Sequence, residues 1–222
     1  MDILKRHEQF EIEVLEGMKN SRFLDPLVFG GGTMLRLCYE LNRYSADLDF
    51  WFAKKIKPAA YFRNLKHFLS AEYDVTDAQI KYYTLLFEIR NRNYPKRLKI
   101  EIRKEKKAGG FQERIAFSPY SSKQVMLRVY TIEEMMKNKV AAALDRREIR
   151  DFFDMEFLIK RGAPLDVSSR QRAALRSVIS TFTKRDFSVT LGAFLDPATR
   201  KFYVENGFAL LLEKIGNIAP ST

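Results

Sequence analysis

The chain has 222 residues, of which 46% are hydrophobic and 30% are charged, a composition that excludes an intrinsically disordered protein. A chain of this length can bury one substantial core or two small ones. Thirty-nine lysines and arginines against 28 aspartates and glutamates give a formal net charge of +11, which favours a polyanionic substrate or partner. Cys38 is the only cysteine, which excludes a disulfide scaffold or a cysteine zinc site within one chain.

The N-terminal region and the overall hydropathy pattern favour a cytoplasmic protein without membrane contact. The sequence has no run of about 18 or more apolar residues, so it predicts no transmembrane helix. Its first residues, MDILKRHEQFEIE, are charged and lack the apolar core of a signal peptide. Apolar positions at helical spacing predict a first helix over residues 3–19.

A glycine-rich turn follows the short apolar strand predicted at residues 27–29. Because Gly30, Gly31 and Gly32 have no Cβ, the backbone there can approach an anion closely. Thr33 is the expected N-cap of a helix whose apolar residues are Met34, Leu35, Leu37, Cys38 and Leu41. A helix N-terminus preceded by glycines is well suited to bind phosphate, so this segment predicts a phosphate site.

Two aspartates alternate with apolar residues in the next segment. Period-two alternation places Asp47 and Asp49 on one face of a strand, with Leu48 and Phe50 on the other. Two adjacent carboxylates repel each other and are costly to bury, so a bound cation is the simplest explanation. Mg²⁺ suits such hard oxygen ligands and keeps positions for substrate phosphates and water. A glycine turn or an aspartate pair alone is usually a loop or a solvated strand face, but their succession fits a centre for phosphoryl or nucleotidyl transfer.

The middle of the chain predicts a hairpin that carries a third carboxylate. A helix is expected to begin at Pro58 and to end near residue 69. The β-rich runs 82–90 and 97–103 then predict a hairpin beside the first strand. Glu101 shares a face of the second run with basic neighbours, which is typical of a surface ion pair, although it could join the aspartate pair. Residues 104–112 predict a basic loop.

The C-terminal part of the chain predicts a last strand followed by helices. Thr131 and two following glutamates predict the start of a helix that ends near residue 144. This helix carries Lys139 in an alanine-rich stretch, where a lysine can point into a cleft. The spacing of four charged residues then predicts a network on one helix face, made of Arg147, Arg150, Asp151 and Asp154. The other expected elements are a strand over 124–130 and helices over 172–182 and 204–215, with Pro197 interrupting.

The order of strand, Gly-Gly-Thr, helix and Asp-x-Asp resembles the opening of the DNA polymerase β-like nucleotidyltransferase superfamily. Over about residues 25–160 the chain resembles the AbiEii/AbiGii family, also called the MenT-like nucleotidyltransferase toxins. The matching positions are Gly31-Gly32-Thr33, then Arg43-Tyr44-Ser45-Ala46-Asp47-Leu48-Asp49-Phe50, and then Lys139, Arg146 and Arg150-Asp151-Phe152-Phe153-Asp154.

This resemblance implies an α/β (α+β) fold with a division into two parts. A polymerase-β-like core with a mixed sheet is expected over residues 1–130, and a helical C-terminal region over residues 131–222 is expected to pack against it. The resemblance implies a third acidic position that ligates metal or accepts a proton, and it places Glu101 there. The implied catalytic residues are Asp47, Asp49, Glu101 and Lys139, with the three carboxylates as metal ligands. The implied nucleotide-binding residues are Gly31, Gly32, Thr33, Arg43, Ser45, Arg146 and Asp151.

The resemblance further implies Mg²⁺-dependent transfer of a nucleotide from NTP to an RNA, the 3′ end of tRNA in some members. It implies a toxin with a cognate antitoxin. One alternative is AMPylation, the transfer of the nucleotide to a protein hydroxyl, which would use the same residues. The other is a catalytically silent module that uses the charge of +11 to hold RNA or a partner, against which the intact glycine turn and aspartate pair argue.

Overall fold

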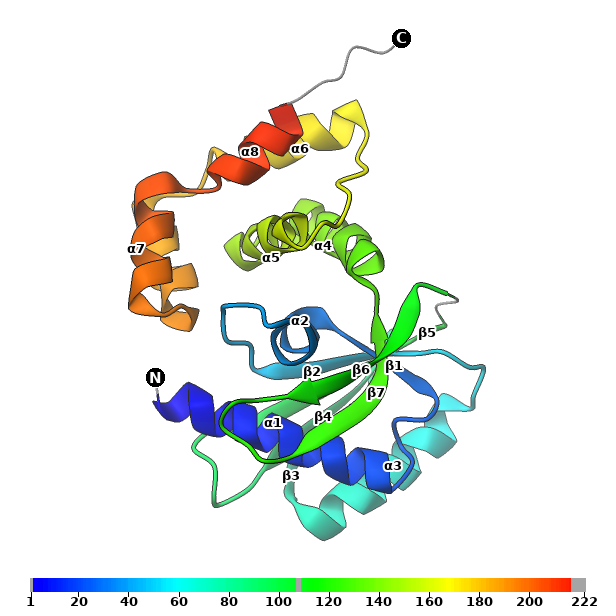
Figure 1. Ribbon diagram of the computed structural model, residues 1–222. Coiled ribbons are helices and arrows are strands. Elements are labelled where there is room, and N and C mark those ends of the chain that lie inside the picture. Colours follow the sequence, from blue (N-terminus) through cyan, green and yellow to red (C-terminus); the bar gives the residue numbers. More distant parts are fainter. Residues whose placement is uncertain (1, 107–108, 217–222) are drawn as a thin grey trace. The chain divides into compact units, whose positions relative to one another are not determined.

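The computed structural model describes residues 2–106 and 109–216, and their contacts divide the chain into two compact units (Figure 1). The first unit comprises Met1–Glu40 and Tyr44–Tyr130, and the second comprises Leu41–Arg43 and Thr131–Thr222. The first unit contains a mixed sheet, and the second is built from helices. In the described part of the chain, no helix combines the length and the apolar character needed to span a membrane.

The sheet of the first unit has seven strands in the order β3-β4-β5-β2-β1-β7-β6. Their bounds are β1 (Leu27–Gly30), β2 (Asp47–Phe52), β3 (Asp74–Ile80), β4 (Thr84–Arg90), β5 (Leu98–Lys106), β6 (Phe111–Phe117) and β7 (Gln124–Tyr130). The aspartate-bearing strand β2 is central, because it pairs antiparallel with β1 and parallel with β5. The expected mixed α/β architecture is therefore confirmed.

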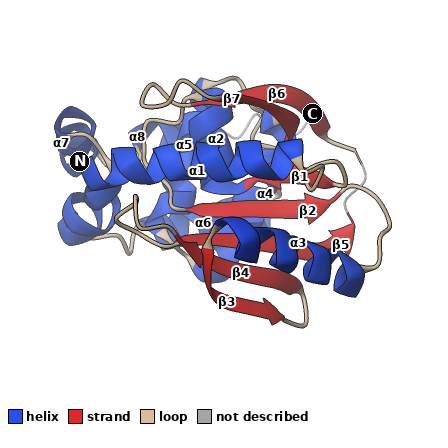
Figure 2. Ribbon diagram, turned by 90° about the horizontal axis from the view of Figure 1, so that it is seen from below, coloured by secondary structure: helices blue, strands red, loops and turns tan. Residues whose placement is uncertain are grey.

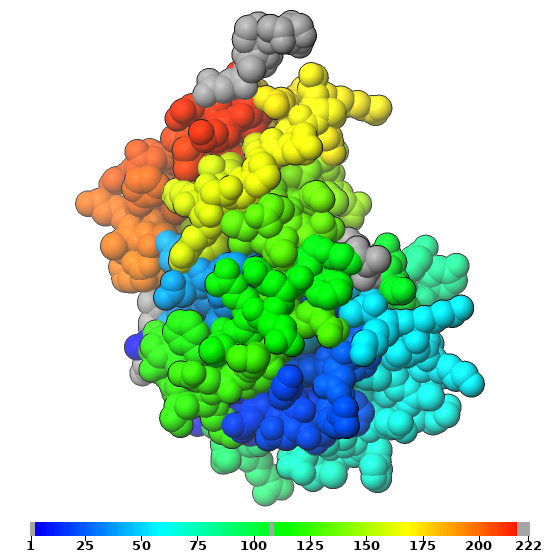
Figure 3. Space-filling view, turned by 45° about the vertical axis from the view of Figure 1, so that its right-hand side comes forward, coloured from blue at the N-terminus to red at the C-terminus, as the bar shows by residue number. Residues whose placement is uncertain are grey.

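Helices cover both faces of this sheet. α1 (Asp2–Asn20) and α3 (Pro58–Glu72) cross one face, as Figure 2 shows, and α2 (Gly31–Tyr39) lies on the other. Alternate residues of β2 face α1 and α3, so Leu48, Phe50 and Phe52 are all at most 2% exposed. The Phe52 ring meets the ring of Tyr61, which lies on α3, at 5.3 Å. In the space-filling view, the blue atoms of α1 lie beside the green atoms of the β6–β7 hairpin (Figure 3).

The second unit consists of α4 (Ile132–Arg146), α5 (Ile149–Lys160), α6 (Ser169–Ile179), a π-helical turn (Asp186–Leu191), a 3-10 turn (Gly192–Phe194), α7 (Pro197–Asn206) and α8 (Ala209–Gly216). The hydroxyl of Thr131 accepts a hydrogen bond from the backbone N–H of Glu134, which confirms the expected N-cap of α4. Aromatic rings fill the core of the unit: Phe152 contacts Phe182 and Phe208, and Phe208 also contacts Tyr203.

Two strands and one helix differ from the expectations. The strands β3 and β6 were not expected, because they form the two edges of the sheet and more than half of the residues in each are exposed, so neither carries a continuous buried face. The loop expected over 104–112 is wrong at both ends, since β5 ends at Lys106 and β6 begins at Phe111, while residues 107–108 lie outside the described residues. Pro197 begins α7 rather than interrupting a helix, because Asp196 caps the helix and a proline is tolerated in its first turn.

The hairpin of β4 and β5 is confirmed, but its place in the sheet is not the expected one. The two strands pair antiparallel through Thr84↔Arg103 to Ile89↔Leu98. The hairpin lies beside β2 and not beside the first strand, because β5 forms a parallel ladder with β2. The pairing of β5 with β2 brings Glu101 of the hairpin next to the strand that carries Asp47 and Asp49.

Candidate active site

The turn between β1 and α2 contains no loop residue. The helix begins at Gly31, with Gly30 as an extended N-cap that makes no side-chain capping bond, so the expected N-cap role of Thr33 is wrong. Gly31 has φ +76°, a left-handed conformation that a glycine adopts without steric cost and that turns the strand directly into the helix. A Cβ on Gly31 would lie 2.3 Å from Oδ2 of Asp49. The glycine turn is therefore in contact with the aspartate pair.

Thr33 occupies the first turn of α2 and is fully buried. Its Oγ1 has no hydrogen-bond partner among the described residues. A buried hydroxyl without a partner costs roughly 1–3 kcal/mol, so the fold by itself leaves this position unsatisfied. The first N–H groups of a helix also lack intrahelical acceptors and carry partial positive charge, which suits a phosphate. Ser45 is half-buried in the segment that leads into β2.

The aspartate pair has the alternation that the sequence predicts. Asp47 and Asp49 are half-buried, whereas Leu48 and Phe50 between and after them are buried. In the register of the sheet, Asp49 lies opposite Gly30 on β1 and opposite Glu101 on β5. The structure thus brings the glycine turn, the two aspartates and Glu101 together on one face of the sheet.

Lys99 is a member of this cluster whose place the sequence did not reveal. It lies opposite Asp47 in the register of β2 and β5, and its Nζ is 2.5 Å from Oε1 of Glu101. Burial alone would lower the pKa of Lys99, but its hydrogen bond to Glu101 and the charges of Glu101, Asp47 and Asp49 raise the pKa above its ordinary value. Lys99 therefore stays protonated and offsets part of the negative charge.

The described residues contain no group of three histidine, cysteine, aspartate or glutamate side chains arranged to hold a metal ion. The donors at the site are nevertheless of one chemical kind, since Asp47, Asp49 and Glu101 all offer carboxylate oxygens. Mg²⁺ commonly binds one or two protein carboxylates and takes its remaining ligands from substrate phosphates and water. The aspartate pair fits that pattern, and the metal-binding role of Glu101 stays a prediction.

His7 supports the backbone that leads into β2, a role that helical spacing in the sequence does not indicate. Its ring is fully buried, and Nε2 donates to the carbonyl oxygen of Ala46 at 3.0 Å. Burial lowers the pKa of His7, so the ring is neutral and carries its proton on the nitrogen that faces the carbonyl. Because Ala46 immediately precedes Asp47, this hydrogen bond links α1 to the position of the first aspartate.

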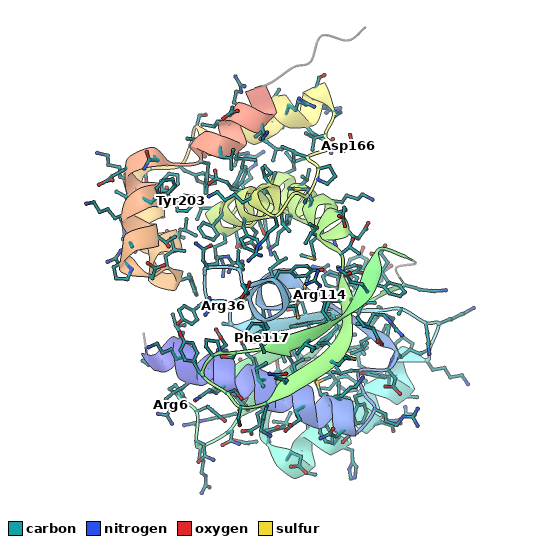
Figure 4. All side chains as sticks on the ribbon, viewed as in Figure 1. Arg6, Arg36, Arg114, Phe117, Asp166 and Tyr203 are labelled. Carbon is teal, nitrogen blue, oxygen red and sulfur yellow. The ribbon has the colours of Figure 1, made fainter. Side chains whose placement is uncertain are left out.

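Two acidic residues of α1 lie near His7. Burial first, and then the charges of Glu8 and Asp47, raise the pKa of Glu11 well above its ordinary value. Arg36, which belongs to α2 and is labelled in Figure 4, donates from Nε to Oε2 of Glu8 at 2.9 Å. The ion pair of Arg36 and Glu8 therefore joins α1 to α2.

The second unit contains a buried ion-pair network built around two aspartates of α5. Arg43 binds Asp154 through two hydrogen bonds of 2.6 Å and 2.7 Å, and Lys139 lies 2.6 Å from the same carboxylate. Lys139 also donates to Asp151 at 3.0 Å, and Arg146 binds Asp151 at 2.7 Å and 2.8 Å. The side chains of both aspartates are completely buried.

The residues of this network differ from those predicted from the sequence. Asp151 and Asp154 belong to it, but Arg147 does not, because Arg147 is the left-handed C-cap between α4 and α5 with φ +55°. Arg150 instead pairs with Glu148 at 2.8 Å. The cations that neutralise the aspartates come from α4 and from the segment Leu41–Arg43, which helical spacing on α5 alone could not identify.

Replacing Gly31 with alanine is expected to lower nucleotide transfer by more than tenfold, up to about a hundredfold, because the new Cβ must displace the Asp49 carboxylate. Gly109→Ala is the matched control: its φ of +79° is nearly the same, but among the described residues, its chain neighbours aside, no atom lies within 4 Å of the added Cβ. Both variants carry the left-handed backbone strain of roughly 1–2 kcal/mol. Equal transfer rates in the two variants, measured beside thermal midpoints, would show that contact with Asp49 is unnecessary.

The chain is similar to one protein family and to solved structures. Residues 13–217 match the family model described as nucleotidyl transferase AbiEii toxin, type IV toxin–antitoxin system. A solved structure of a candidate nucleotidyltransferase from Helicobacter pylori is 23% identical, with a TM-score of 0.51 over 93% of this chain and 96% of that chain. The structure of JHP933 from Helicobacter pylori is also 23% identical, with a TM-score of 0.48 over 86% and 85%. No curated protein gives a match. The structure with a TM-score of 0.51 shows that the two chains share a fold.

Proposed function

The chain belongs to the AbiEii family of nucleotidyl transferase toxins, and from this membership we propose that it transfers a nucleotide from NTP to RNA, with the 3′ end of tRNA as acceptor. Membership makes the protein a nucleotidyltransferase of a type IV toxin–antitoxin system, with a nucleotide substrate and a cognate antitoxin. The observation that carries the proposal is the contact of Gly31 with Asp49, which joins a helix N-terminus to a carboxylate pair. The net charge of +11 supports a polyanionic acceptor.

Asp47 and Asp49 would hold Mg²⁺ together with phosphate oxygens of the nucleotide. When bound, the ion would neutralise negative charge at the α-phosphoryl group and on the departing pyrophosphate. The first turn of α2, from Gly31 to Thr33, would bind the triphosphate through its N–H groups and the buried hydroxyl. Ser45 is proposed as a further contact to the triphosphate, as the family pattern implies.

The acceptor hydroxyl oxygen would attack the α-phosphorus, and the bond from that phosphorus to the pyrophosphate oxygen would break. A carboxylate must accept the proton of the hydroxyl, and Glu101 is the proposed acceptor because it lies opposite Asp49 on the neighbouring strand. Lys99 holds Glu101 in the described arrangement, so the carboxylate would have to exchange this partner to act. The negative charges of Asp47 and Asp49 help to raise the pKa of the same lysine. Lys99 would therefore offset part of the negative charge at the site.

The roles implied for the second unit stay predictions. Lys139, Arg43 and Arg146 are engaged with Asp151 and Asp154, and Lys139 is only 5% exposed. We propose that the main role of this ion-pair network is to stabilise the second unit. The catalytic role of Lys139 and the nucleotide contacts of Arg43, Arg146 and Asp151 are supported by the family pattern.

Incubation with each α-labelled NTP, total RNA and total protein tests the acceptor. We expect Mg²⁺-dependent label that nuclease removes, that EDTA prevents and that migrates with tRNA. Label that resists nuclease and is removed by protease would reject the RNA acceptor and favour AMPylation of a protein. If calorimetry detects no metal-dependent triphosphate binding, the protein is a silent binding module and the catalytic proposal is wrong.

A further inference from the structure

A pair of exposed tyrosines forms the turn between β3 and β4. Tyr82 is 83% exposed and Tyr83 is 73% exposed, and their rings meet edge to face with centroids 4.5 Å apart. The turn is tight, since the backbone N–H of Lys81 donates to the carbonyl oxygen of Thr84 at 2.9 Å. Burial therefore does not explain the presence of two large rings.

The geometry of the turn does not explain them either. Two-residue hairpin turns favour glycine, asparagine and aspartate, which adopt positive φ or bond their own backbone. Tyr82 and Tyr83 have neither property, and neither has positive φ. Two adjacent aromatic rings directed to solvent are the arrangement on which unpaired nucleobases stack, because every base presents a π face.

Basic residues of the turn and of β5 lie near the tyrosine pair, with Glu105 as an exposed acidic residue among them. Lys81 is exposed within the turn, and Arg103 and Lys106 are exposed near the end of β5. Lys104 joins the two elements: its Nζ donates to the carbonyl oxygens of Lys81 and Tyr82, and its backbone N–H donates to Tyr83 at 2.9 Å. Aromatic rings on which bases can stack, next to cations that can contact phosphates, suit a single-stranded nucleic acid.

The pair also lies on a path to the aspartates. Trp51 follows Asp49 at the next alternate position of β2, so the two share a face of the sheet. The guanidinium of Arg103 lies over the Trp51 ring at 5.8 Å, and Arg103 is opposite Thr84, the residue that follows the tyrosines. From strand spacing and rise, the path from Thr84, the residue after the tyrosines, to Asp49 measures about 7 Å along the strands and about 10 Å across them.

We propose that Tyr82 and Tyr83 form a stacking site for single-stranded RNA, and that Trp51 and Arg103 continue it toward the aspartate pair. This inference rests on the proposed function, because it gives a location on the first unit to the unpaired part of the acceptor. It assigns the tyrosines to binding and not to chemistry. Bases would stack on the rings while Lys81 and its basic neighbours contact phosphates.

Fluorescence anisotropy with a labelled, unstructured RNA of about 12 nucleotides tests the site. The double variant Tyr82→Ala/Tyr83→Ala is expected to bind at least about tenfold more weakly, and Tyr82→Phe/Tyr83→Phe within about twofold of wild type, because stacking needs the ring and not the hydroxyl. Lys81→Ala is expected to reduce the slope of log affinity against log salt by about 0.7.

Phe117→Ala is the matched control. Phe117, labelled in Figure 4, is a 40% exposed aromatic on β6, at the opposite edge of the same sheet. This variant should bind RNA as the wild type does. Equal weakening in the tyrosine and Phe117 variants would overturn the proposal, as would an alanine double variant with wild-type affinity, which would leave the tyrosines to a protein partner.

Binding and transfer are measured separately so that the two proposals can fail separately. If wild type labels no RNA but the tyrosine variants lose RNA affinity, the nucleotidylation of RNA is wrong and the stacking site stands. If wild type labels tRNA and the alanine double variant matches it in both affinity and transfer, the stacking site is wrong and the enzymatic proposal stands. Nucleotide binding, followed with a fluorescent NTP, should be unchanged in the tyrosine variants.

Discussion

Replacing Asp47 or Asp49 with alanine is expected to reduce nucleotide transfer by more than about a hundredfold, because either change removes a carboxylate that would bind the metal ion. The same variants should keep their thermal midpoint or raise it, since they relieve repulsion between two carboxylates on one face of β2. Loss of activity without loss of stability separates a chemical role from a structural one. The measurements are initial rates of labelled-nucleotide transfer and thermal midpoints by calorimetry.

Asp74→Ala is the matched control for this experiment. Asp74 is an exposed aspartate on β3 of the same sheet, opposite Arg90 and away from the aspartate pair in strand order. Its loss should leave transfer within about twofold of wild type, as for a surface substitution. Transfer by Asp47→Ala or Asp49→Ala within tenfold of this control would sink the proposed mechanism.

Replacing Asp154 with alanine is expected to lower the free energy of unfolding of the second unit by about 3–5 kcal/mol. The carboxylate is completely buried and neutralises Arg43 and Lys139. Its removal leaves these two buried cations without one of their carboxylate partners. Urea unfolding of the variant measures the loss. Lys137→Ala, on the same helix as Lys139 but with a 71% exposed side chain, should change the free energy by less than about 0.5 kcal/mol.

The same network predicts a loss of stability in acid. Burial alone would raise the pKa of Asp154, but Arg43 and Lys139 outweigh it and hold the pKa below its ordinary value of 3.8. Asp151 is lowered in the same way, with burial offset by Arg146 and Lys139. A carboxyl whose pKa is lower in the folded state contributes stability above its unfolded pKa and loses it as the pH falls through the folded pKa.

The thermal midpoint of wild type should therefore be constant with respect to these groups above about pH 5 and fall progressively below it. Asp154→Ala should show a smaller fall, because one of the two carboxyls is gone. A wild-type midpoint that is independent of pH in this range would mean that the aspartates do not carry the charge assigned to them. Lys139→Ala should also destabilise the second unit, so a loss of transfer in that variant must be compared with its midpoint.

The sequence alone determined the elements whose pattern is local. Alternation in β2 set Asp47 and Asp49 on one face, and the glycines at the start of α2 marked the turn, because both features depend on residues within a few positions of each other. The helical start at Thr131 was also evident, since the capping hydroxyl and the backbone N–H that donates to it are three residues apart. The edge strands β3 and β6 were not readable, because a strand with solvent on one side and at its edge has no continuous apolar pattern.

Only the tertiary structure decided which distant side chains meet. Strand register places Lys99 opposite Asp47 and Glu101 opposite Asp49, and a shift by one residue would have turned both side chains to the buried face. Arg43 and Asp154 are 111 residues apart in sequence, and no local rule pairs them. The residue types at the candidate site follow from local sequence pattern, whereas their ion-pair partners follow from packing, because the Coulomb energy of a charge depends on distance in space and on burial, and not on separation along the chain.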